Sequence, residues 1–512
     1  MESPKGADTE VHTAMRYTKA EVVLVPQPSH DPADPLNWSM TKKIFILALV
    51  SLSSFIGVAQ ALANQSGFFV QATLYHKSPV QISYSVSAAI AGLASGPFLW
   101  TALSQRIGRS SCIFWGLLGT LGCGIWAARM TDTDEYIPFV ISRWLGGTFG
   151  SAASTIGAGT VLDMFFLHQR GKAFTCYTIS TLFGTQVGPT LSGFIAQYSS
   201  WPVQYWWTIG LEGAAAILVF IFLEETGFSR DGKVYPRLPR SWLQNRLITF
   251  FPGTKVMPRS REQGKQSPFT VFLVFICPVT LLAGAFLFIA FGWAVAVTTL
   301  LSVFLQTRKE EGGYGFSPVQ VSCFTFAQWT GIIAAEIYGM VVNDRVPLWF
   351  CHRYRAGIWK PETRLYPLLY IPAVLLPIGL GIFGSALQYH LHYMVLALAV
   401  FLIVFCEIAL VPVIITYVVE CFTNHASEVN TVLNFFRLIL GLVVPFFIEP
   451  WLERVGPGWV FGMMAFFTLF AFSLTGLLAW KGEVIRQYSL RRLGKSEAGT
   501  QLIVVEESES NA

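Results

Sequence analysis

Charged residues are scarce in this sequence. Asp, Glu, Lys and Arg make up 13% of the 512 residues, whereas 53% are hydrophobic and 15% are aromatic. Soluble globular domains average about 25% charged residues, so this composition excludes an ordinary water-soluble globule. The composition instead predicts a protein whose solvent is the lipid bilayer.

Several motifs of enzyme and cofactor chemistry are also missing. The eight cysteines show no CxxC or other metal-ligand spacing, and the eight histidines are scattered, with His390 and His392 the one close pair, in a predicted loop. We therefore expect free thiols, no metal and no cofactor. No Gly-x4-Gly-Lys-Ser/Thr run is present to bind the phosphates of ATP. A membrane enzyme such as a desaturase or acyltransferase would need clustered catalytic residues, so the sequence predicts no enzyme.

Long apolar runs fill most of the chain. Crossing about 30 Å of hydrocarbon takes about 20 residues of helix, and the sequence offers about twelve such runs. Six lie at 43–64, 81–104, 111–129, 136–159, 172–197 and 204–223, and six lie at 279–305, 318–341, 366–387, 393–418, 430–450 and 458–480. No apolar segment precedes Lys42, so no cleaved signal peptide is predicted.

The basic residues predict the orientation and the segments. Most Lys and Arg fall in the two ends, in the middle segment and in alternate loops, which places both ends of the chain in the cytosol. The predicted segments are a tail (1–42), a six-helix bundle (43–223), a cytosolic linker (224–268), a second six-helix bundle (269–480) and a second tail (481–512). Residues 267–278 form either an interfacial helix or a continuation of the seventh span. The net charge of +5 follows from this asymmetry and requires no nucleic-acid partner.

The stretch GTQVGPTLSG, residues 184–193, puts glycine and proline inside the fifth apolar run. Small residues let helices approach closely in lipid, and Gly184, Gly188 and Ser192 form such a strip at helical spacing. Pro189 removes one helical hydrogen bond, so the helix can bend there. The strip predicts close packing against either a moving neighbour or a static one.

This stretch resembles the fifth-helix antiporter motif of the major facilitator superfamily, including Gly193 after Ser192. Other matches follow in order: DPADPLNWS (31–39), RWLGGTFGSAAS with GTVLDMFFLHQRGKA, KPETRLYP (360–367), TYVVECF (416–422) and NFFR (434–437). Together they resemble the fungal twelve-span drug:proton antiporters, in the branch with polyamine, amiloride-resistance and metabolite-cluster transporters. The resemblance implies an all-α membrane fold of two six-helix bundles that rock around a central cavity.

One part of the sequence departs from the family pattern. After the second span the family has glycine, then aspartate four residues later, then RxGRR, whereas this chain has Thr101, Gln105 and RIGRSS. The aspartate helps the family to lock the two bundles together, so Gln105 puts that charged latch in doubt. The predicted gating positions are Gln105, Arg106, Gly108, Arg109, Asp163 and Glu420.

Few charged residues lie within the spans, and each is a candidate for transport because its insertion costs roughly 2.5–3.5 kcal/mol. Arg143 matches the family arginine that is linked to proton movement, with a structural ion pair or interfacial position as the alternative. Glu407, in the middle of the tenth span, is the leading candidate for proton or substrate binding. Arg437 is expected to pair with Glu407 or with the acidic residue at 420. Glu336 and Glu212 are weaker candidates.

Polar and aromatic residues of other spans complete a predicted cavity. Mixed ring faces and hydrogen-bonding groups bind amphipathic organic molecules, although helix packing explains any one of them. The predicted lining residues are Gln60, Asn64, Gln186, Trp293, Gln328 and Trp329.

The sequence therefore predicts a monomeric, multi-pass transporter that exports a small organic molecule in exchange for protons. The resemblance places it in the plasma membrane, with the vacuolar membrane as the alternative. The competing functions are proton-symport uptake of a small organic cation or nutrient, and a transporter-like sensor that binds its ligand without moving it.

Overall fold

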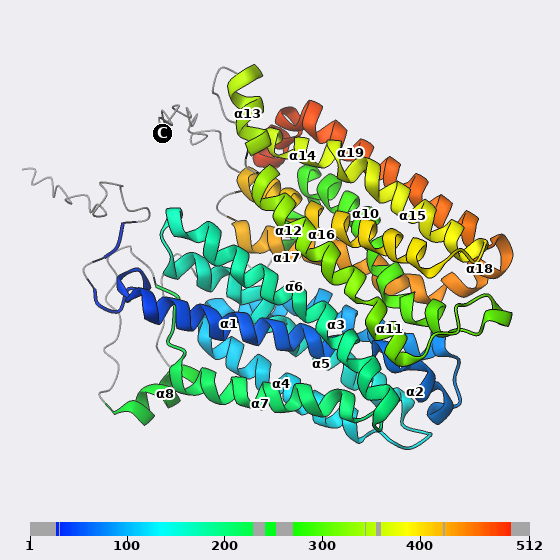
Figure 1. The fold of residues 1–512 in the computed structure, drawn as a ribbon. Helices are drawn as coiled ribbons and strands as arrows, with labels where there is room; N and C mark the ends of the chain where they lie inside the picture. The colour runs from blue at the N-terminus through cyan, green and yellow to red at the C-terminus, as the bar shows by residue number, and fades with distance from the viewer. Residues whose placement is uncertain are drawn as a thin grey trace, which may run out of the picture.

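The computed structural model describes residues 27–29, 31–228, 241–251, 270–343, 345–354, 360–422 and 425–492, and all regular elements in these ranges are helices. Long helices run side by side in two groups (Figure 1). We call residues before 229 the N-half and residues from 270 onward the C-half. The end of the molecule where the first long helix begins is called the inner end, because the sequence predicts that it faces the cytosol; the opposite end is the outer end.

Six long helices build the N-half, and each overlaps one predicted span. They are α1 (Met40–Ala61), α3 (Pro79–Ile107), α4 (Arg109–Arg129), α5 (Tyr136–Met164), α6 (Leu167–Tyr198) and α7 (Val203–Phe222). The short elements η1 (Pro35–Asn37), η2 (Gln65–Gly67) and α2 (Phe68–Tyr75) flank α1, and α8 (Trp242–Phe250) follows α7.

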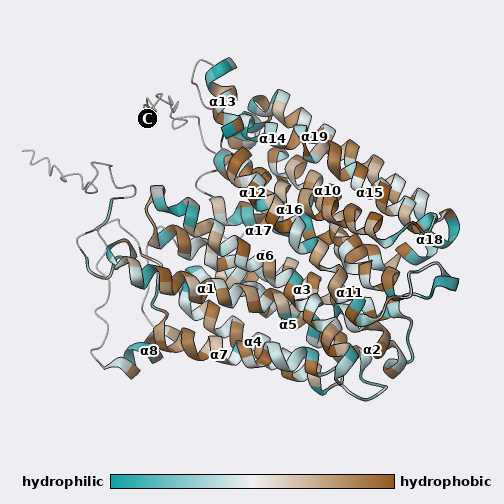
Figure 2. Ribbon diagram, in the orientation of Figure 1, coloured by the Kyte–Doolittle hydropathy of each residue, from teal (hydrophilic) through white to brown (hydrophobic). Residues whose placement is uncertain are grey.

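The C-half contains the other six passages. Its elements are α9 (Thr270–Ile276), α10 (Pro278–Gln306), η4 (Lys309–Glu311), α11 (Pro318–Phe324), α12 (Phe326–Val342), α13 (Arg345–Tyr354), η5 (Pro361–Leu365), α14 (Tyr366–Tyr370), α15 (Pro372–Gln388), α16 (Tyr393–Cys421), α17 (Ala426–Val443), η7 (Val444–Phe446), α18 (Ile448–Val455) and α19 (Pro457–Arg492). Within the described residues, nine helical segments are long and apolar enough to cross a membrane. Hydrophobic residues dominate the long helices (Figure 2). Hydrophilic residues gather in α13 and α18, which lie near the ends of the long helices.

Local sequence signals explain where several helices begin. Ser78 and Ser317 each accept a hydrogen bond from the backbone amide three residues later, and Gln81 and Gln320 return the bond, so both helix starts have complete capping boxes. Proline follows directly at Pro79 and Pro318, where its missing amide costs nothing. These caps fix the outer starts of α3 and α11.

Three boundaries differ from a simple reading of the apolar runs. The residues before Pro278 form the separate helix α9, because Cys277 is extended and breaks the helix, so a continuous seventh span is wrong. The interfacial position of α9 stays a prediction. The eighth passage is divided into α11 and α12. The last helix, α19, continues to Arg492 instead of ending at 480, because Glu483 and Arg486 form ion pairs with residues before α14.

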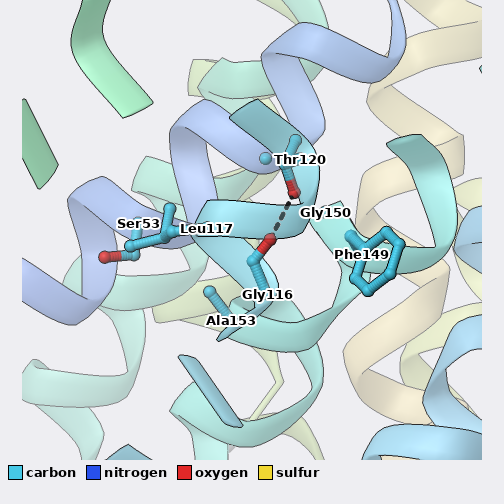
Figure 3. Close-up of a pocket in the computed structure, with 8 residues that line it drawn as sticks. Ser53, Gly116, Leu117, Thr120, Phe149, Gly150 and Ala153 are labelled. Carbon is cyan, nitrogen blue, oxygen red and sulfur yellow. Dashed lines mark hydrogen bonds between the residues drawn. The ribbon is translucent and has the colours of Figure 1, made fainter. Parts of the chain in front are cut away.

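A small gap within the N-half lies between α1, α4 and α5 (Figure 3). It is lined by Ser53, Gly57, Gly116, Leu117, Thr120, Phe149, Gly150 and Ala153. The gap has no room for a water molecule, and the Thr120 hydroxyl is used internally, donating to the Gly116 carbonyl at 2.8 Å. It is a packing seam of small residues and no candidate for substrate binding.

Candidate functional site

Helix α6 packs directly on the backbone of α1 through its glycines. A Cβ atom at Gly184 would lie 2.5 Å from the carbonyl oxygen of Phe55, and one at Gly188 would lie 2.5 Å from that of Ala59. Both distances are shorter than real carbon contacts, so only glycine fits. Pro189 lies inside the helix, and the Ser66 hydroxyl donates to its carbonyl at 2.9 Å. Ser192 is fully buried.

The outer part of α6 also contacts the C-half. A Cβ atom at Gly193 would overlap the Ser322 side chain and the Pro318 carbonyl of α11. The Ser322 hydroxyl donates to the Thr190 carbonyl at 2.6 Å, and the Thr190 and Thr325 hydroxyls are 2.7 Å apart. The antiporter stretch therefore lies at the junction of the two halves, where neutral hydroxyl groups join them.

The outer end of α1 makes a second junction between the halves. Gln65 donates through Nε2 to the Thr298 carbonyl of α10, and Gln306 of α10 donates through Nε2 to the Ser66 carbonyl at 3.0 Å. Among the described residues, every hydrogen bond between α1, η2 or α6 and the C-half involves Gln65, Ser66 or Thr190, as donor or as acceptor. These helices are therefore joined to the C-half at their outer ends.

Helices α3 and α17 form the third junction, which extends along most of their length. Tyr84 stacks on Phe446 near the outer end, with ring centroids 4.4 Å apart. Asn434 donates to the Leu93 carbonyl at 3.2 Å in the middle. Near the inner end, the hydroxyls of Thr101 and Thr431 are 3.0 Å apart. Thr101, one of the departures from the family pattern, thus makes a contact between the halves.

Comparison with known families settles what this arrangement is. A model of the Major Facilitator Superfamily matches residues 44–445. The chain belongs to the major facilitator superfamily. It is therefore a multi-pass membrane transporter and not an enzyme, as the sequence predicts.

The curated relatives of this transporter include fungal export proteins. "Efflux pump radE" of Floropilus chiversii is 27% identical over 473 residues, which cover 90% of this chain and 84% of the relative. "MFS-type transporter hepF" of Aspergillus oryzae is 26% identical over 510 residues, which cover 95% of this chain and 99% of the relative. The resemblance to fungal transporters of this superfamily is confirmed.

Solved structures confirm the fold. The xylose transporter XylE from E. coli aligns with a TM-score of 0.58 at 16% identity, covering 86% of this chain and 98% of that one. The human organic anion transporter MFSD10 aligns with a TM-score of 0.52 at 15% identity, covering 87% and 100%. The predicted all-α major facilitator fold of two six-helix bundles is therefore confirmed.

In the N-half of the transporter, Arg143 holds the outer end of α1. Its side chain is buried, and Nη2 donates to the carbonyls of Gln60 and Ala61 at 3.1 and 2.6 Å and to Asn64 Oδ1 at 3.4 Å. The guanidinium carbon lies 4.9 Å from the ring centroid of Tyr205. A cation at the carboxyl end of a helix also offsets the partial negative charge of the terminal carbonyls. Arg143 thus caps α1.

The predicted cavity residues Gln60 and Asn64 lie inside the N-half with Arg143. Gln60 donates to the Thr120 carbonyl of α4 at 3.0 Å, and Asn64 donates to Ser85 of α3 at 2.9 Å. Both side chains are buried. These contacts explain them as packing residues, and a role in substrate binding stays a prediction.

In the C-half, Glu407 of α16 and Arg437 of α17 lie near enough for each charge to act on the other. They form no direct ion pair, and the Arg437 guanidinium instead lies 5.3 Å from the ring centroid of Phe291 on α10. Glu407 is buried with 8% exposure, whereas Arg437 is half-buried. The other predicted partner of Arg437 is engaged elsewhere, because Glu420 forms an ion pair with Arg364 at 2.6 Å.

The predicted gating loop contains an ion pair inside the N-half. Arg109, at the inner start of α4, pairs with Asp163 near the inner end of α5. Gly108 has a positive φ of 90°, and the Glu225 carboxylate accepts hydrogen bonds from the backbone amides of Arg109 and residue 110 at 3.0 and 3.1 Å. Arg106 and Gln105 are exposed. The structure therefore joins α4, α5 and the end of α7 at this point.

A matching set of ion pairs lies at the inner end of the C-half. Besides the pair at Glu420, the Arg486 guanidinium of α19 pairs with the buried carboxylate of Glu362 at 3.2 Å, and Lys360 pairs with Glu483 at 2.7 Å. They join η5, α16 and α19 as the N-half set joins its own helices. The acidic residues at 163 and 420 thus each form an ion pair at the inner end of their own half.

The remaining predicted cavity residues, and the candidate proton-binding Glu336, lie in different surroundings. Trp329 lies between the halves, since its Nε1 donates to Thr190 Oγ1 at 3.1 Å and its ring lies 5.3 Å from that of Phe183. Trp293 packs within the C-half against Trp451 and Phe467. Gln186 and Gln328 are buried, and Glu336 is half-buried. Of this set, Trp329 has the placement that suits contact with a transported molecule.

All eight cysteines are free thiols, and no group of three His, Cys, Asp or Glu side chains within the described ranges has the arrangement of a metal site. Sequence reasoning did not single out the hydroxyl contacts of Thr190, Thr101 and Thr431, or the pair of Glu362 with Arg486. The threonines carry no distinguishing signal, because Ser and Thr are common in membrane helices. Glu362 and Arg486 lie outside the apolar runs in which charge stands out.

Proposed function

We propose that this transporter exports a small organic molecule in exchange for protons by alternating access. The observation that carries the proposal is the acid–base couple of Glu407 and Arg437 in the middle of the C-half. A carboxylate in such an apolar helix is costly and marks a functional position in membrane transporters. A carboxyl group there can bind a proton, and the nearby guanidinium makes its charge state sensitive to movement of α17.

The contacts between the halves suit a rocking mechanism. At the outer end they consist of neutral hydrogen bonds, each of which contributes about 0.5–1.5 kcal/mol net, and of close glycine packing. Such a surface can open and close without separating buried ion pairs. The ion pairs formed among the described residues at the inner end each join helices of the same half. These ion pairs therefore keep each half rigid while the two halves move against each other.

Export is proposed over uptake on two grounds. The stretch from Gly184 to Gly193, which resembles the antiporter motif of the family, lies at the outer junction of the halves. Relatives across most of the chain include proteins named as efflux pumps, among them "MFS-type efflux pump MFS2" of Trichophyton rubrum at 25% identity. The proposed cargo is an amphipathic organic molecule that uses the ring of Trp329 and the carboxylate of Glu407.

Transport in proteoliposomes tests this function. Purified protein is reconstituted, a pH gradient is imposed, and uptake is measured for a panel of drugs, polyamines and fungal metabolites. Native protein is expected to accumulate one class of compound only while the gradient is present. Glu407→Gln is expected to lose gradient-driven accumulation, since it removes the proton-binding group at nearly constant volume.

A matched control is Glu453→Gln, which changes an exposed carboxylate at the outer end of α18 and should transport like the native protein. Gradient-driven transport that is unchanged in Glu407→Gln would contradict the site assignment. Compound binding without any transport would favour the sensor over the exporter.

A further inference from the structure

Glu212, on α7, is a buried carboxylate that the proposed mechanism does not use. Its side chain is fully buried, and neither carboxylate oxygen has a hydrogen-bond partner among the described residues. An ionised carboxylate without donors is among the most costly groups to bury.

Arg143 is the basic side chain whose charge acts on Glu212. The two groups form no direct ion pair or hydrogen bond, and the Arg143 Nε also has no partner within the described residues. Arg143 is therefore placed between two attractions. Its Nη2 is bonded to the carbonyls at the end of α1, and Glu212 attracts the same guanidinium from the side of α7.

The other ionisable groups around Glu212 are few. Helix α4 contributes Cys123, on which both Glu212 and Arg143 act electrostatically. Helix α7 itself contributes Tyr205, whose ring lies against the Arg143 guanidinium. Tyr75 of α2 interacts electrostatically with Tyr205 and with Glu135, which precedes α5.

The remaining helices that pack on α7 carry their ionisable groups near their ends. In α1 these are Lys42 and Lys43 in the first turn, and in α8 the basic residue is Arg246. The described side chains of α6 include Arg170, Lys172, Cys176 and Tyr177 toward the inner end and Tyr198 at the outer end. Within the N-half, the charged partner of Glu212 is thus Arg143.

The segment that Arg143 holds is also the segment that joins the halves. Its bonds reach the carbonyls of Gln60 and Ala61 and the side chain of Asn64. The next two residues, Gln65 and Ser66, make the hydrogen bonds to Thr298 and Gln306 of α10. A change in how Arg143 grips the end of α1 is therefore transmitted within one or two residues to the outer junction.

We propose that Glu212 is a second proton-binding group and that its charge controls closure of the outer junction through Arg143. With a neutral Glu212, the guanidinium stays on the α1 carbonyls and the outer end is closed. With an ionised Glu212, the guanidinium is drawn toward α7, the cap on α1 weakens and the junction opens. The inference rests on the proposed function for its link to transport, but the local response to pH requires no transported molecule.

Pulsed electron–electron spin resonance on the protein in lipid nanodiscs tests the proposal. Spin labels are placed at Val70 of α2 and Glu453 of α18, which are exposed, after replacement of the exposed Cys176 and Cys323 by serine. The fraction of long outer-end distances is measured against pH without substrate or gradient. In the native protein this fraction is expected to rise with pH by about fivefold, the lower end of typical coupling between sites.

Glu212→Gln mimics the neutral carboxyl group and is expected to show the short distances at every pH. Glu212→Asp keeps an ionisable group and should retain a pH response with a displaced midpoint, which a merely structural role would not produce. Glu449→Gln, an exposed acid at the outer end, should behave as native.

A native pH response that persists in Glu212→Gln, or a native protein without any response, would overturn the inference. If Glu212→Gln does not yield monodisperse protein, Glu212→Asp decides: a pH response whose midpoint is the same as in the native protein would also overturn the inference. The result is separable from the proposed function, because loss of proton-coupled transport in Glu407→Gln is scored in liposomes and this response is scored without transport.

Discussion

At the scale of single residues, two arginines within the membrane-spanning helices, the buried Arg143 and the half-buried Arg437, take different roles in the two halves. Arg143 caps the outer end of α1 through backbone carbonyls, whereas Arg437 lies against Phe291 and faces Glu407. The resemblance links Arg143 with proton movement, and its contacts give that link a physical form. A side chain that holds a helix end can pass a change in charge to the junction of the halves.

The interaction of Glu407 with Arg437 predicts coupled effects on stability. Arg437→Gln leaves a buried carboxylate without its cation, so it is expected to lower the melting temperature in detergent more than Glu407→Gln does. The double variant should recover part of that loss, with a coupling energy on the order of 1 kcal/mol. Additive effects in this double-mutant cycle would show that the two side chains do not interact.

The sequence reveals Arg143, Glu407 and Arg437 because charge inside an apolar run stands out. It does not reveal their contacts, since these depend on how helices far apart in the chain are rotated toward each other. Gln60 and Trp293 are examples: the sequence predicts both as cavity residues, which stays a prediction, but it does not predict that Gln60 donates to the Thr120 carbonyl of α4 or that Trp293 packs against Trp451. Residue type alone does not say which face of a membrane helix meets a neighbour.

At the scale of elements, α6 packs both on α1 of its own half and on α11 of the other half. Gly184 and Gly188 seat it on α1, and Gly193 and Thr190 seat it on α11. The sequence predicts the close approach from the spacing of small residues. Whether the neighbour belongs to the same half or to the other one is decided by the fold, and the structure shows that both occur on one helix.

Substitution of these glycines distinguishes the packing of α6 within the N-half from its role in closing the outer end. Gly188→Ala forces α6 away from the Ala59 carbonyl within the N-half and should destabilise the protein. Gly193→Ala forces α6 away from α11 and should leave thermal stability closer to native while weakening outer closure. Outer closure is measured with the label pair described above.

The control is Gly210→Ala, where a Cβ atom meets nothing within 4 Å and alanine favours the helix by roughly 0.5–1 kcal/mol. Equal effects of all three alanine variants would contradict the assignment of these contacts. If the outer end of Gly193→Ala stays closed as in the native protein, the contact of α6 with α11 does not control outer closure.

The loop between α3 and α4 shows how far a family pattern can be carried. The charged latch of the family is absent at Gln105, which is exposed, and the neighbouring departure to Thr101 supplies a hydroxyl contact to Thr431 of α17. The sequence shows the loss of the aspartate, but the contact of Thr101 with Thr431 becomes visible only in the fold, which places α3 beside α17.

At the scale of the whole molecule, the twelve passages and their two groups follow from the apolar runs, because crossing the bilayer fixes their length. The contacts between the halves do not follow from the positions of the apolar runs. They are neutral and concentrated at the outer end for α1 and α6, whereas the ion pairs at the inner end whose two partners both lie in the described ranges join residues of the same half. This division supports two rigid bodies that separate along surfaces of hydroxyl groups and glycine.

The most direct test of proton exchange is the direction of proton movement when substrate alone provides the driving force. Proteoliposomes are loaded with the compound identified in the transport panel and with a pH-sensitive dye, and they are then diluted into medium without the compound and without a pH gradient. As the compound leaves, proton exchange predicts that the lumen becomes acidic, and that Glu407→Gln shows no such change. A lumen that becomes alkaline would establish symport, and an unchanged lumen pH in the native protein would contradict proton coupling altogether.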